Sequence, residues 1–442
     1  MDFKQTLKSF KEFIFKYKDW LFMGTICLLL FFSHMCAPLW AVASLITIGY
    51  YAICDFGKII ALTMFFAPLS GIKYFYVVSL AGAFLVVSAR YIFEAVNRKV
   101  KVFWKPLGLT IAFIAVFAVA RYNFNGLGFE QGGMSIALLF GLYLCFVYAK
   151  TINVHKCFMY LLLGLAVSSG LGIVSLLFKN VDFSIVYDDG IQARLELFCF
   201  HMNHLAMFAA FEIAYLTHSL INKKHGLVLP IVGIVFSLIL GLATLSKAFI
   251  LICGVVLAYA LVVLMIKLKK QAWKVILPLS CVLLVSVVVF WDVFEVLFSR
   301  FVAYNKNTSL LNQITTGRMT IWKEYLKDIS SSIPKMLFGV GLFNAPLNEI
   351  GPHNVLLFFA RRVGLIGIIF LGLIVYSYFE ESHFRIKATL SNSLLFVVYF
   401  AYSLEEMIFS DRFIFFLVFA ILLMAKGTED GVVQNQEQQF HV

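Results

Sequence analysis

The sequence predicts an all-α, polytopic membrane protein, and three observations lead to that fold class. Hydrophobic residues make up 62% of the 442 positions, and charged residues only 14%. The mean hydropathy is +0.91. The apolar residues also come in successive runs of about 20, the length that a helix needs to cross a bilayer with its backbone polar groups bonded internally.

The breaks between the apolar runs predict about fourteen transmembrane helices, within a range of about 12–14. The range reflects the shortness of one run and the two glutamates, Glu405 and Glu406, inside another. The predicted spans cover residues 19–34, 38–54, 57–69, 73–92, 106–121, 134–149, 157–177, 200–220, 226–243, 247–266, 275–291, 355–378, 391–408 and 413–426.

These spans divide the chain into five regions. The regions are a cytoplasmic amphipathic helix at 1–18, a bundle of spans at 19–291, a large extracytoplasmic loop with amphipathic helices at 292–354, C-terminal spans at 355–426 and a polar, disordered tail at 427–442. In the first region, phenylalanines alternate with lysines at helical spacing, which is typical of a helix lying on the inner leaflet. Residues 1–18 are therefore not expected to be a cleavable signal sequence.

Basic residues fall in every second connection, starting from the lysine-rich N-terminus. These connections carry Arg98-Lys99-Val100-Lys101, Lys150 with Lys156, Lys223-Lys224-His225 and Lys267-Leu268-Lys269-Lys270. Because cytoplasmic loops are enriched in Lys and Arg, both termini are predicted to be cytoplasmic and the remaining polar loops to face outward. The net charge of +12 then indicates contact with anionic lipid headgroups, and no nucleic-acid signature accompanies it.

The eight cysteines lie mostly within or at the ends of apolar runs, and none forms a CxxC pair. In that setting cysteine is a small hydrophobic residue, so neither a disulfide nor a metal site is predicted from them. A zinc site built from His201, His204 and His353 is a further alternative, but no HExxH motif or carboxylate at ligand spacing supports it.

Three polar constellations fall on the predicted outer face. The first is Gln192-Ala193-Arg194-Leu195, followed by His201-Met202-Asn203-His204 as a span begins. Free N–H groups at a helix N-terminus favour anions, so Arg194, His201, Asn203 and His204 are candidate ligands of a phosphate group. The alternative is that Arg194 pairs with one of the nearby acidic residues Asp188, Asp189 and Glu196.

The second constellation lies in the sequence 315–326. Thr316 is a suitable helix cap, and Met319, Trp322, Tyr325 and Leu326 recur at helical spacing, which predicts an amphipathic helix on the membrane surface. Arg318 would then point from the first turn toward the spans; the alternative is a solvated surface charge. Trp322 and Tyr325 are candidate substrate-binding residues.

The third constellation is His353, which follows Gly351-Pro352 at the start of a span. A helix N-terminus disfavours imidazolium and keeps the ring neutral, as a general base must be. The alternative is a polar cap. Asn354 could orient the ring or bind a sugar hydroxyl.

Three further cations are candidates for substrate binding. Arg361 and Arg362 lie about 12 Å deeper along the same helix as His353, where a charged residue needs a partner. That partner is either Glu405 or Glu406 or a phosphate. Lys247, in Thr244-Leu245-Ser246-Lys247, stands at the outer end of another span.

The order of these motifs resembles that of the bacterial O-antigen ligase and polymerase family. The resemblance covers about residues 190 to 370 and runs through Arg194, His201-Met202-Asn203-His204-Leu205-Ala206, Leu245-Ser246-Lys247-Ala248, Gly317-Arg318 with Trp322, Phe338-Gly339-Val340-Gly341, His353-Asn354 and Gly364-Leu365-Ile366-Gly367. Two departures are Lys247, where the family often has arginine, and Arg361-Arg362, where an acidic residue is common.

The resemblance implies a GT-C-like, inverting glycosyltransferase that needs no metal or other cofactor and takes a glycan from undecaprenyl pyrophosphate. Arg194 and Arg318 would bind the donor pyrophosphate, and His353 would deprotonate the acceptor hydroxyl. Guanidinium groups can stabilise the departing pyrophosphate bidentately.

The surplus cations Lys247, Arg361 and Arg362 favour a polymerase, because its acceptor is a second lipid-linked repeat unit. A flippase and a chain-length regulator of the same pathway are then the expected protein partners. The alternatives are a ligase, which joins finished glycan to a lipid A core or another anchor, and a lipid-linked sugar transporter. Transporters usually have internal repeats and charges near the bilayer midplane, and no convincing repeat is found here.

Overall fold

The fold is known from a computed structural model that describes most of the chain. The described residues are 3–33, 35–72, 74–119, 126–177, 186–188, 193–199, 201–222, 226–269, 291, 295, 317–344, 347, 351–382, 385–386, 389, 392–405 and 413–426. The predicted span at 275–291, apart from its last residue, and the predicted tail at 427–442 lie outside them.

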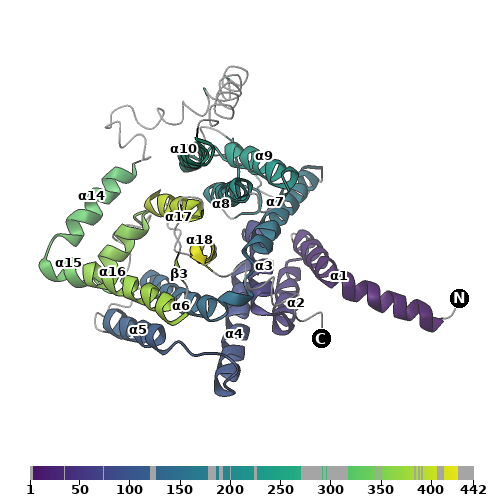
Figure 1. Cartoon of the computed structure of the whole chain (residues 1–442), viewed down its shortest axis with the longest axis horizontal. Helices are drawn as coiled ribbons and strands as arrows, with labels where there is room; N and C mark the ends of the chain where they lie inside the picture. Colours follow the sequence, from purple (N-terminus) through teal and green to yellow (C-terminus); the bar gives the residue numbers. More distant parts are fainter. Residues whose placement is uncertain are drawn as a thin grey trace.

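Helices make up almost all of the described structure (Figure 1). They are α1 (Phe3–Phe32), α2 (Leu39–Ile53), α3 (Phe56–Phe66), η1 (Ala67–Leu69), α4 (Phe75–Val96), α5 (Trp104–Ile114), η2 (Ala115–Val119), α6 (Gly126–Val147), η3 (Ala149–Thr151), α7 (Val154–Leu177), α8 (Met202–Ile221), α9 (Val228–Ala243), α10 (Lys247–Leu268), α14 (Arg318–Ile329), α15 (Ile333–Phe338), α16 (Val355–Ser382), α17 (Leu394–Glu405) and α18 (Ile414–Met424).

Two short antiparallel strand pairs connect helices. Strand β1 (Val186–Asp188) pairs with β2 (Ala193–Leu195) between α7 and α8. Strand β3 (Arg385–Ile386), just after α16, pairs with β4 (Ala425–Lys426), which directly follows α18.

Each predicted apolar segment within the described residues coincides with a helix. Five helices in this part of the chain are long and apolar enough to cross a membrane, namely Phe75–Val96, Val154–Ser175, Met202–Ile221, Lys247–Lys267 and Val355–Glu381. Helix α9 is shorter, and it turns large apolar side chains such as Val228, Val232 and Ile239 outward. An apolar outer surface suits hydrocarbon rather than water. The chain is therefore a helical membrane protein.

The boundary predicted at residue 18 is not a break in the structure. Helix α1 runs without interruption from Phe3 to Phe32, because no proline interrupts that stretch. Figure 1 shows its N-terminal half extending away from the other helices. Asp19, within α1, forms an ion pair with Lys58 of α3 at 2.5 Å, which anchors the second half.

Helix α18 lies in the middle of the bundle (Figure 1). Its sequence, Ile-Phe-Phe-Leu-Val-Phe-Ala-Ile-Leu-Leu-Met, is apolar on all sides, and nearly all of its residues are buried. The ring of Phe416 stacks on Phe211 of α8 with centroids 4.1 Å apart and contacts Phe158 of α7 at 5.8 Å. A helix without a polar face is expected at such a central position.

Helix α16 is broken at Gly364, which has φ 64° and ψ −172°. The break leaves carbonyls of the preceding turn without their usual helical donors. The segment after α15 supplies them: Val340 N–H donates to the Arg361 carbonyl and Gly341 N–H to the Arg362 carbonyl, both at 2.8 Å. Backbone that is not helical is tolerated at membrane depth only when protein surrounds it in this way.

Glycine is required on both sides of this contact. Gly339 has φ 68°, and a Cβ there would lie 2.3 Å from the carbonyl carbon of Arg362. A Cβ at Gly364 would lie 2.4 Å from the carbonyl oxygen of Leu337. The two Gly-containing motifs of the sequence therefore meet in space.

Replacing Gly364 by alanine is expected to lower the stability of the protein by about 2–4 kcal/mol, because both the backbone conformation and the Leu337 contact exclude a side chain. The measurement is thermal unfolding of the purified protein in detergent. Gly372→Ala, on the regular part of the same helix where a Cβ meets nothing within 4 Å, is the control and should raise stability by up to about 1 kcal/mol. Equal effects of the two substitutions would contradict the packing described.

Candidate functional site

Several helix ends meet at the end of the bundle where α8 and α16 begin. The side chain of Asn354, just before α16, donates to the carbonyl oxygen of Leu404 near the end of α17 at 3.0 Å. The hydroxyl of Tyr402 in α17 lies 3.5 Å from the carbonyl oxygen of Ala206 in the first turns of α8. The first and third sequence constellations therefore lie at the same end of the bundle.

The histidine cluster is held at the start of α8. His201 is the N-cap, and its Nδ1 accepts a hydrogen bond from Asn203 N–H at 3.1 Å. Its ring lies 5.9 Å from that of His204, which in turn contacts the Phe413 ring at 5.3 Å. His201 is exposed, whereas Asn203 and His204 are half-buried.

The hydrogen bonds of the two rings fix which nitrogen is protonated. Nδ1 of His204 lies 3.3 Å from the carbonyl oxygen of Cys199, which can only accept, so this nitrogen carries the hydrogen. Nδ1 of His201 accepts and therefore carries none. In the neutral forms, Nε2 of His204 then carries the lone pair and Nε2 of His201 carries the hydrogen.

Lys247 also lies at this end. It is the first residue of α10, and Ser246 caps the helix through a hydrogen bond from Phe249 N–H. Tyr259, about 18 Å further along α10, contacts Ser393 at 3.1 Å. Ser393 directly precedes α17, so the start of α10 is level with the other end of α17, where the Leu404 carbonyl lies.

The second constellation joins the third through a hydrogen bond. The indole N–H of Trp322, one turn into α14, donates to the carbonyl oxygen of Pro352 at 2.8 Å. The receiving turn is left-handed at Gly351 (φ 73°) and at His353 (φ 46°). Arg318 begins α14 and is half-buried, so the helix that carries Arg318 is fastened to the turn that carries His353.

Two details of α14 differ from the sequence prediction. The N-cap is Gly317, with φ 83°, and not Thr316, because the chain reaches the helix through a left-handed residue. Tyr325 is 1% exposed and forms the buried centre of the helix face, while Leu326 is 54% exposed.

Asn354 has a structural role that the sequence reading did not assign. It is 7% exposed. Its Oδ1 accepts a hydrogen bond from Leu357 N–H at 3.0 Å, which caps α16, while its amide donates to Leu404. The expected contact of Asn354 with a sugar hydroxyl or with the histidine ring stays a prediction.

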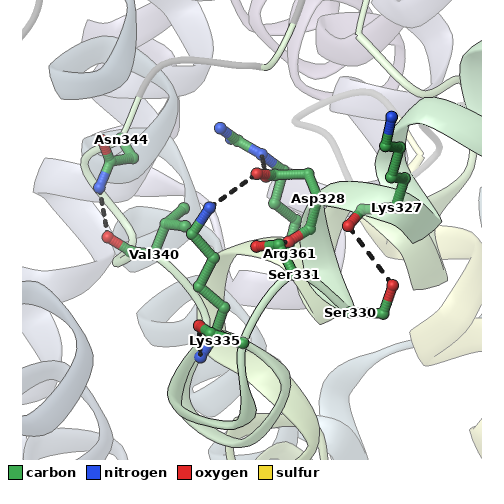
Figure 2. Close-up of polar contacts among 9 residues, drawn as sticks. Lys327, Asp328, Ser330, Ser331, Lys335, Val340, Asn344 and Arg361 are labelled. Carbon is green, nitrogen blue, oxygen red and sulfur yellow. Dashed lines mark hydrogen bonds and ion pairs between the residues drawn. The ribbon is translucent and has the colours of Figure 1, made fainter.

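The partner of Arg361 is Asp328, and neither the expected glutamates nor a phosphate is needed to explain it. Nε of Arg361 donates to Oδ2 of Asp328 at 2.8 Å, and Nζ of Lys335 donates to Oδ1 of Asp328 at 2.8 Å (Figure 2). The guanidinium also lies over the Tyr325 ring, 5.8 Å from its centroid. The network ties α14, α15 and α16 together.

Arg362 is likewise engaged by the protein. It is 1% exposed; one of its terminal nitrogens donates to the Leu342 carbonyl oxygen at 2.8 Å, and its guanidinium lies 4.2 Å from the centroid of Phe358. The side chain supports the segment that bridges the break in α16. Arg361 and Arg362 thus have contacts within the protein, and their predicted contact with substrate stays a prediction.

Tyr325 also belongs to this supporting structure. Its hydroxyl accepts a hydrogen bond from Leu347 N–H at 3.2 Å. Burial raises the pKa of Tyr325, despite the hydrogen bond and the two neighbouring arginines that lower it. The neutral hydroxyl therefore positions the chain after α15, and the expected contact of Tyr325 with substrate stays a prediction.

Arg194 lies in β2, opposite Tyr187 of β1. Its side chain falls outside the described part of the structure, as do most of the acidic residues proposed to pair with it. Its role in binding pyrophosphate stays a prediction. No group of three potential metal ligands occurs among the described residues.

Sequence reasoning missed Asp328 and Lys335, which organise the surroundings of Arg361. Asp328 lies one turn after Glu324 on a helix with charges of both signs, so nothing in the local pattern distinguishes it. Comparison with protein-family models, with curated proteins and with solved structures found no match for this chain.

Asp328→Asn is expected to lower stability at neutral pH by about 1–2 kcal/mol, a value reduced for the partial exposure of Lys335. Burial raises the pKa of Asp328. The hydrogen bonds from Lys335 and Arg361 lower the pKa by more than burial raises it, so that it lies below its ordinary value of 3.8. The carboxylate therefore contributes stability above that value, and the contribution is lost as the pH falls through the lowered pKa.

Unfolding midpoints of the two proteins, measured from neutral pH to below 3.8, should converge at the acidic end. Glu324→Gln, at an exposed position of the same helix, should change stability by less than about 0.5 kcal/mol. A constant difference at every pH would contradict the assigned ion pair.

Trp322→Phe keeps the aromatic ring but leaves the Pro352 carbonyl without its donor. We expect a loss of about 0.5–1.5 kcal/mol and faster hydrogen exchange in the peptide that contains residues 351–357. Mass spectrometry of exchanged peptides is the measurement. Trp104→Phe, at a 72% exposed position of α5, is the control and should leave the exchange of that peptide unchanged. Unchanged exchange in Trp322→Phe would contradict the assigned hydrogen bond.

Proposed function

We propose that this protein is a polymerase of lipid-linked polysaccharide repeat units. It transfers the growing glycan from undecaprenyl pyrophosphate to the non-reducing-end hydroxyl of a new lipid-linked unit. The bond between the anomeric carbon and the pyrophosphate oxygen breaks, the acceptor oxygen bonds to that carbon with inversion, and the acceptor proton passes to His353.

The observation that carries the proposal is the hydrogen bond from Trp322 to the Pro352 carbonyl. It joins the helix that begins with Arg318 to the turn that contains His353. A cation that binds the leaving pyrophosphate and a base that activates the acceptor must work within one substrate complex, so fixing their two segments to each other is what the reaction requires.

Support also comes from the other groups at this end of the bundle. His201, Asn203 and Lys247 stand at the N-termini of two helices, where anionic groups are favoured. Lipid-linked substrates present their pyrophosphates at the membrane surface, which is where helix ends lie. Arg194, in the β1–β2 hairpin just before α8, completes the proposed donor site.

The preference for a polymerase over a ligase now depends on Lys247 together with the histidine cluster. Arg361 and Arg362 carry less of the argument, because they have partners within the protein in Asp328 and the Leu342 carbonyl. Lys247 and His201 would bind the pyrophosphate of the acceptor, a group that the acceptor of a polymerase always carries.

The proposed setting is the plasma membrane of a bacterium. About fourteen helices would cross it in a GT-C-like arrangement, with both termini cytoplasmic and the active end extracytoplasmic. A metal ion is not needed, since the guanidinium groups can carry the charge of the leaving group.

The test is a gel of surface polysaccharide from cells whose only copy carries Arg318→Ala or His353→Ala, with protein levels checked. We expect a loss of long chains of about 100-fold or more, as for removal of a catalytic base or charge stabiliser. Lys323→Ala, an exposed cation on the same helix as Arg318, is the matched control and should keep the wild-type ladder.

The form of the loss distinguishes the functions. Collapse to a single repeat unit supports the polymerase. Long chains that accumulate on the carrier lipid would mean a ligase. An unchanged ladder in both variants would exclude the proposed catalytic roles and favour transport.

A further inference from the structure

A carboxyl group lies fully buried in the middle of α8, away from the candidate site. Glu212 is 0% exposed, and neither of its carboxyl oxygens has a hydrogen-bond partner among the described residues. Isolated carboxyl groups are rare inside membrane helices and are costly there, so their presence calls for an explanation.

No described cation faces Glu212 at its depth. Helices α7, α9, α10 and α17 contact α8, and Phe416 of α18 stacks on Phe211 of α8. Neither α9 nor α18 has a titratable residue, and the lysines of α10 stand at its two ends. The titratable residues of the other described elements around Glu212 are His155, Lys156, Cys157 and Tyr160 of α7, Cys253 and Tyr259 of α10, Tyr399, Tyr402 and Glu405 of α17, and His204, Tyr215 and His218 of α8 itself.

This environment favours the neutral acid. His155 and Lys156 belong to the first turn of α7, and His155 contacts the hydroxyl of Tyr215, whose Cα is one turn from Glu212 in α8, at 2.9 Å. An ionised carboxylate without a nearby cation would lose several kcal/mol of hydration without compensation. Glu212 therefore carries a proton.

The surface of α9 that packs against α8 carries a stripe of small residues. Gly233, Ser237 and Gly241 are one turn apart and buried. A Cβ at Gly233 would lie 2.6 Å from the Leu216 side chain of α8. Helices α8 and α9 are antiparallel, so one turn from this contact brings Glu212 level with Ser237.

Ser237, like Glu212, is a buried polar residue without a hydrogen-bond partner among the described residues. It is 0% exposed. A serine in a helix usually bonds to the carbonyl one turn earlier, and here it does not. Two buried polar groups thus face the same seam, and each can bond to a small polar species such as water.

A cavity of about 420 Å³ approaches the seam from the other end of α8. It is lined by Leu216 and Ser219 of α8, by His155, and by the start of α9 from Gly226 to Pro230. Leu216 is one turn from Glu212 on the same helix face, a rise of about 6 Å. The side chain of Leu216 thus separates the cavity from the carboxyl group.

From this arrangement we propose that Glu212 and Ser237 form a buried proton-binding site between α8 and α9, which exchanges its proton with water through the cavity that ends at Leu216. The ligand is a proton carried by water. The inference does not depend on glycan transfer, because it uses none of the residues at the candidate site.

Infrared spectroscopy of the purified protein tests the proposal. The wild type should show the C=O band of a protonated carboxyl group at neutral pH, and Glu212→Gln should abolish it. Transfer to D₂O should shift the band. Glu324→Gln, at an exposed position of α14, is the control and should leave the band intact.

A second pair of variants tests the route. A Cβ at Gly226 meets nothing within 4 Å, and the same holds for Gly108 in α5. Gly226→Phe should fill the mouth of the cavity and slow the D₂O shift severalfold, whereas Gly108→Phe should not. If Glu212→Gln fails to fold, Ser237→Ala replaces it and should change the position of the band.

Three results would overturn the proposal. Absence of the band in the wild type would mean that Glu212 is ionised. A band that never shifts in D₂O would make Glu212 a sealed packing residue. Loss of the band on adding Na⁺ at constant pH would assign the site to a metal cation.

Discussion

Inside the hydrocarbon region each backbone carbonyl needs a hydrogen-bond donor from the protein itself. The break in α16 deprives the carbonyls of the preceding turn of their helical donors. Water cannot supply the donors there. The segment from Gly339 to Gly341 supplies them, and it can approach only because both it and Gly364 lack side chains. The placement of α14 and α15 follows from this contact, since the same chain leads back to the turn before α16.

The charges around the break have the same origin. Arg361 and Arg362 seemed to demand a phosphate or a distant glutamate when only their depth was considered. Asp328 and Lys335 come from the loop between spans and meet Arg361 beside the break, so the loop supplies counter-charge as well as hydrogen bonds. A polar cluster near a membrane face can therefore be part of the framework, and its neighbours must be known before it is assigned to a ligand.

Apolar periodicity was sufficient to locate the helices, because spans such as α4 and α7 are bounded by clear breaks in hydropathy. It was not sufficient to find the continuity of α1, since a change from polar to apolar composition does not require the backbone to end a helix. The hydrogen bond between Trp322 and Pro352 could not be predicted from the sequence either. The two residues are 30 positions apart, and the sequence around one does not indicate a contact with the other. The histidine and lysine positions at helix starts were accessible from the sequence, because each lies where an apolar run begins. Asn354 was chosen as a candidate site residue because it is next to His353. Its capping bond to Leu357 could not be predicted, because that bond depends on the geometry of the turn.

The central position of α18 has a consequence for how the protein is made. A ribosome delivers α7 and α8 to the membrane long before α18, yet the rings of Phe158 and Phe211 have their packing partner Phe416 only once that helix arrives. Until then the earlier helices must surround lipid or one another in some other order. The bundle therefore cannot assemble simply by adding one helix after another in sequence order, because its central helix is inserted after most of the helices that surround it.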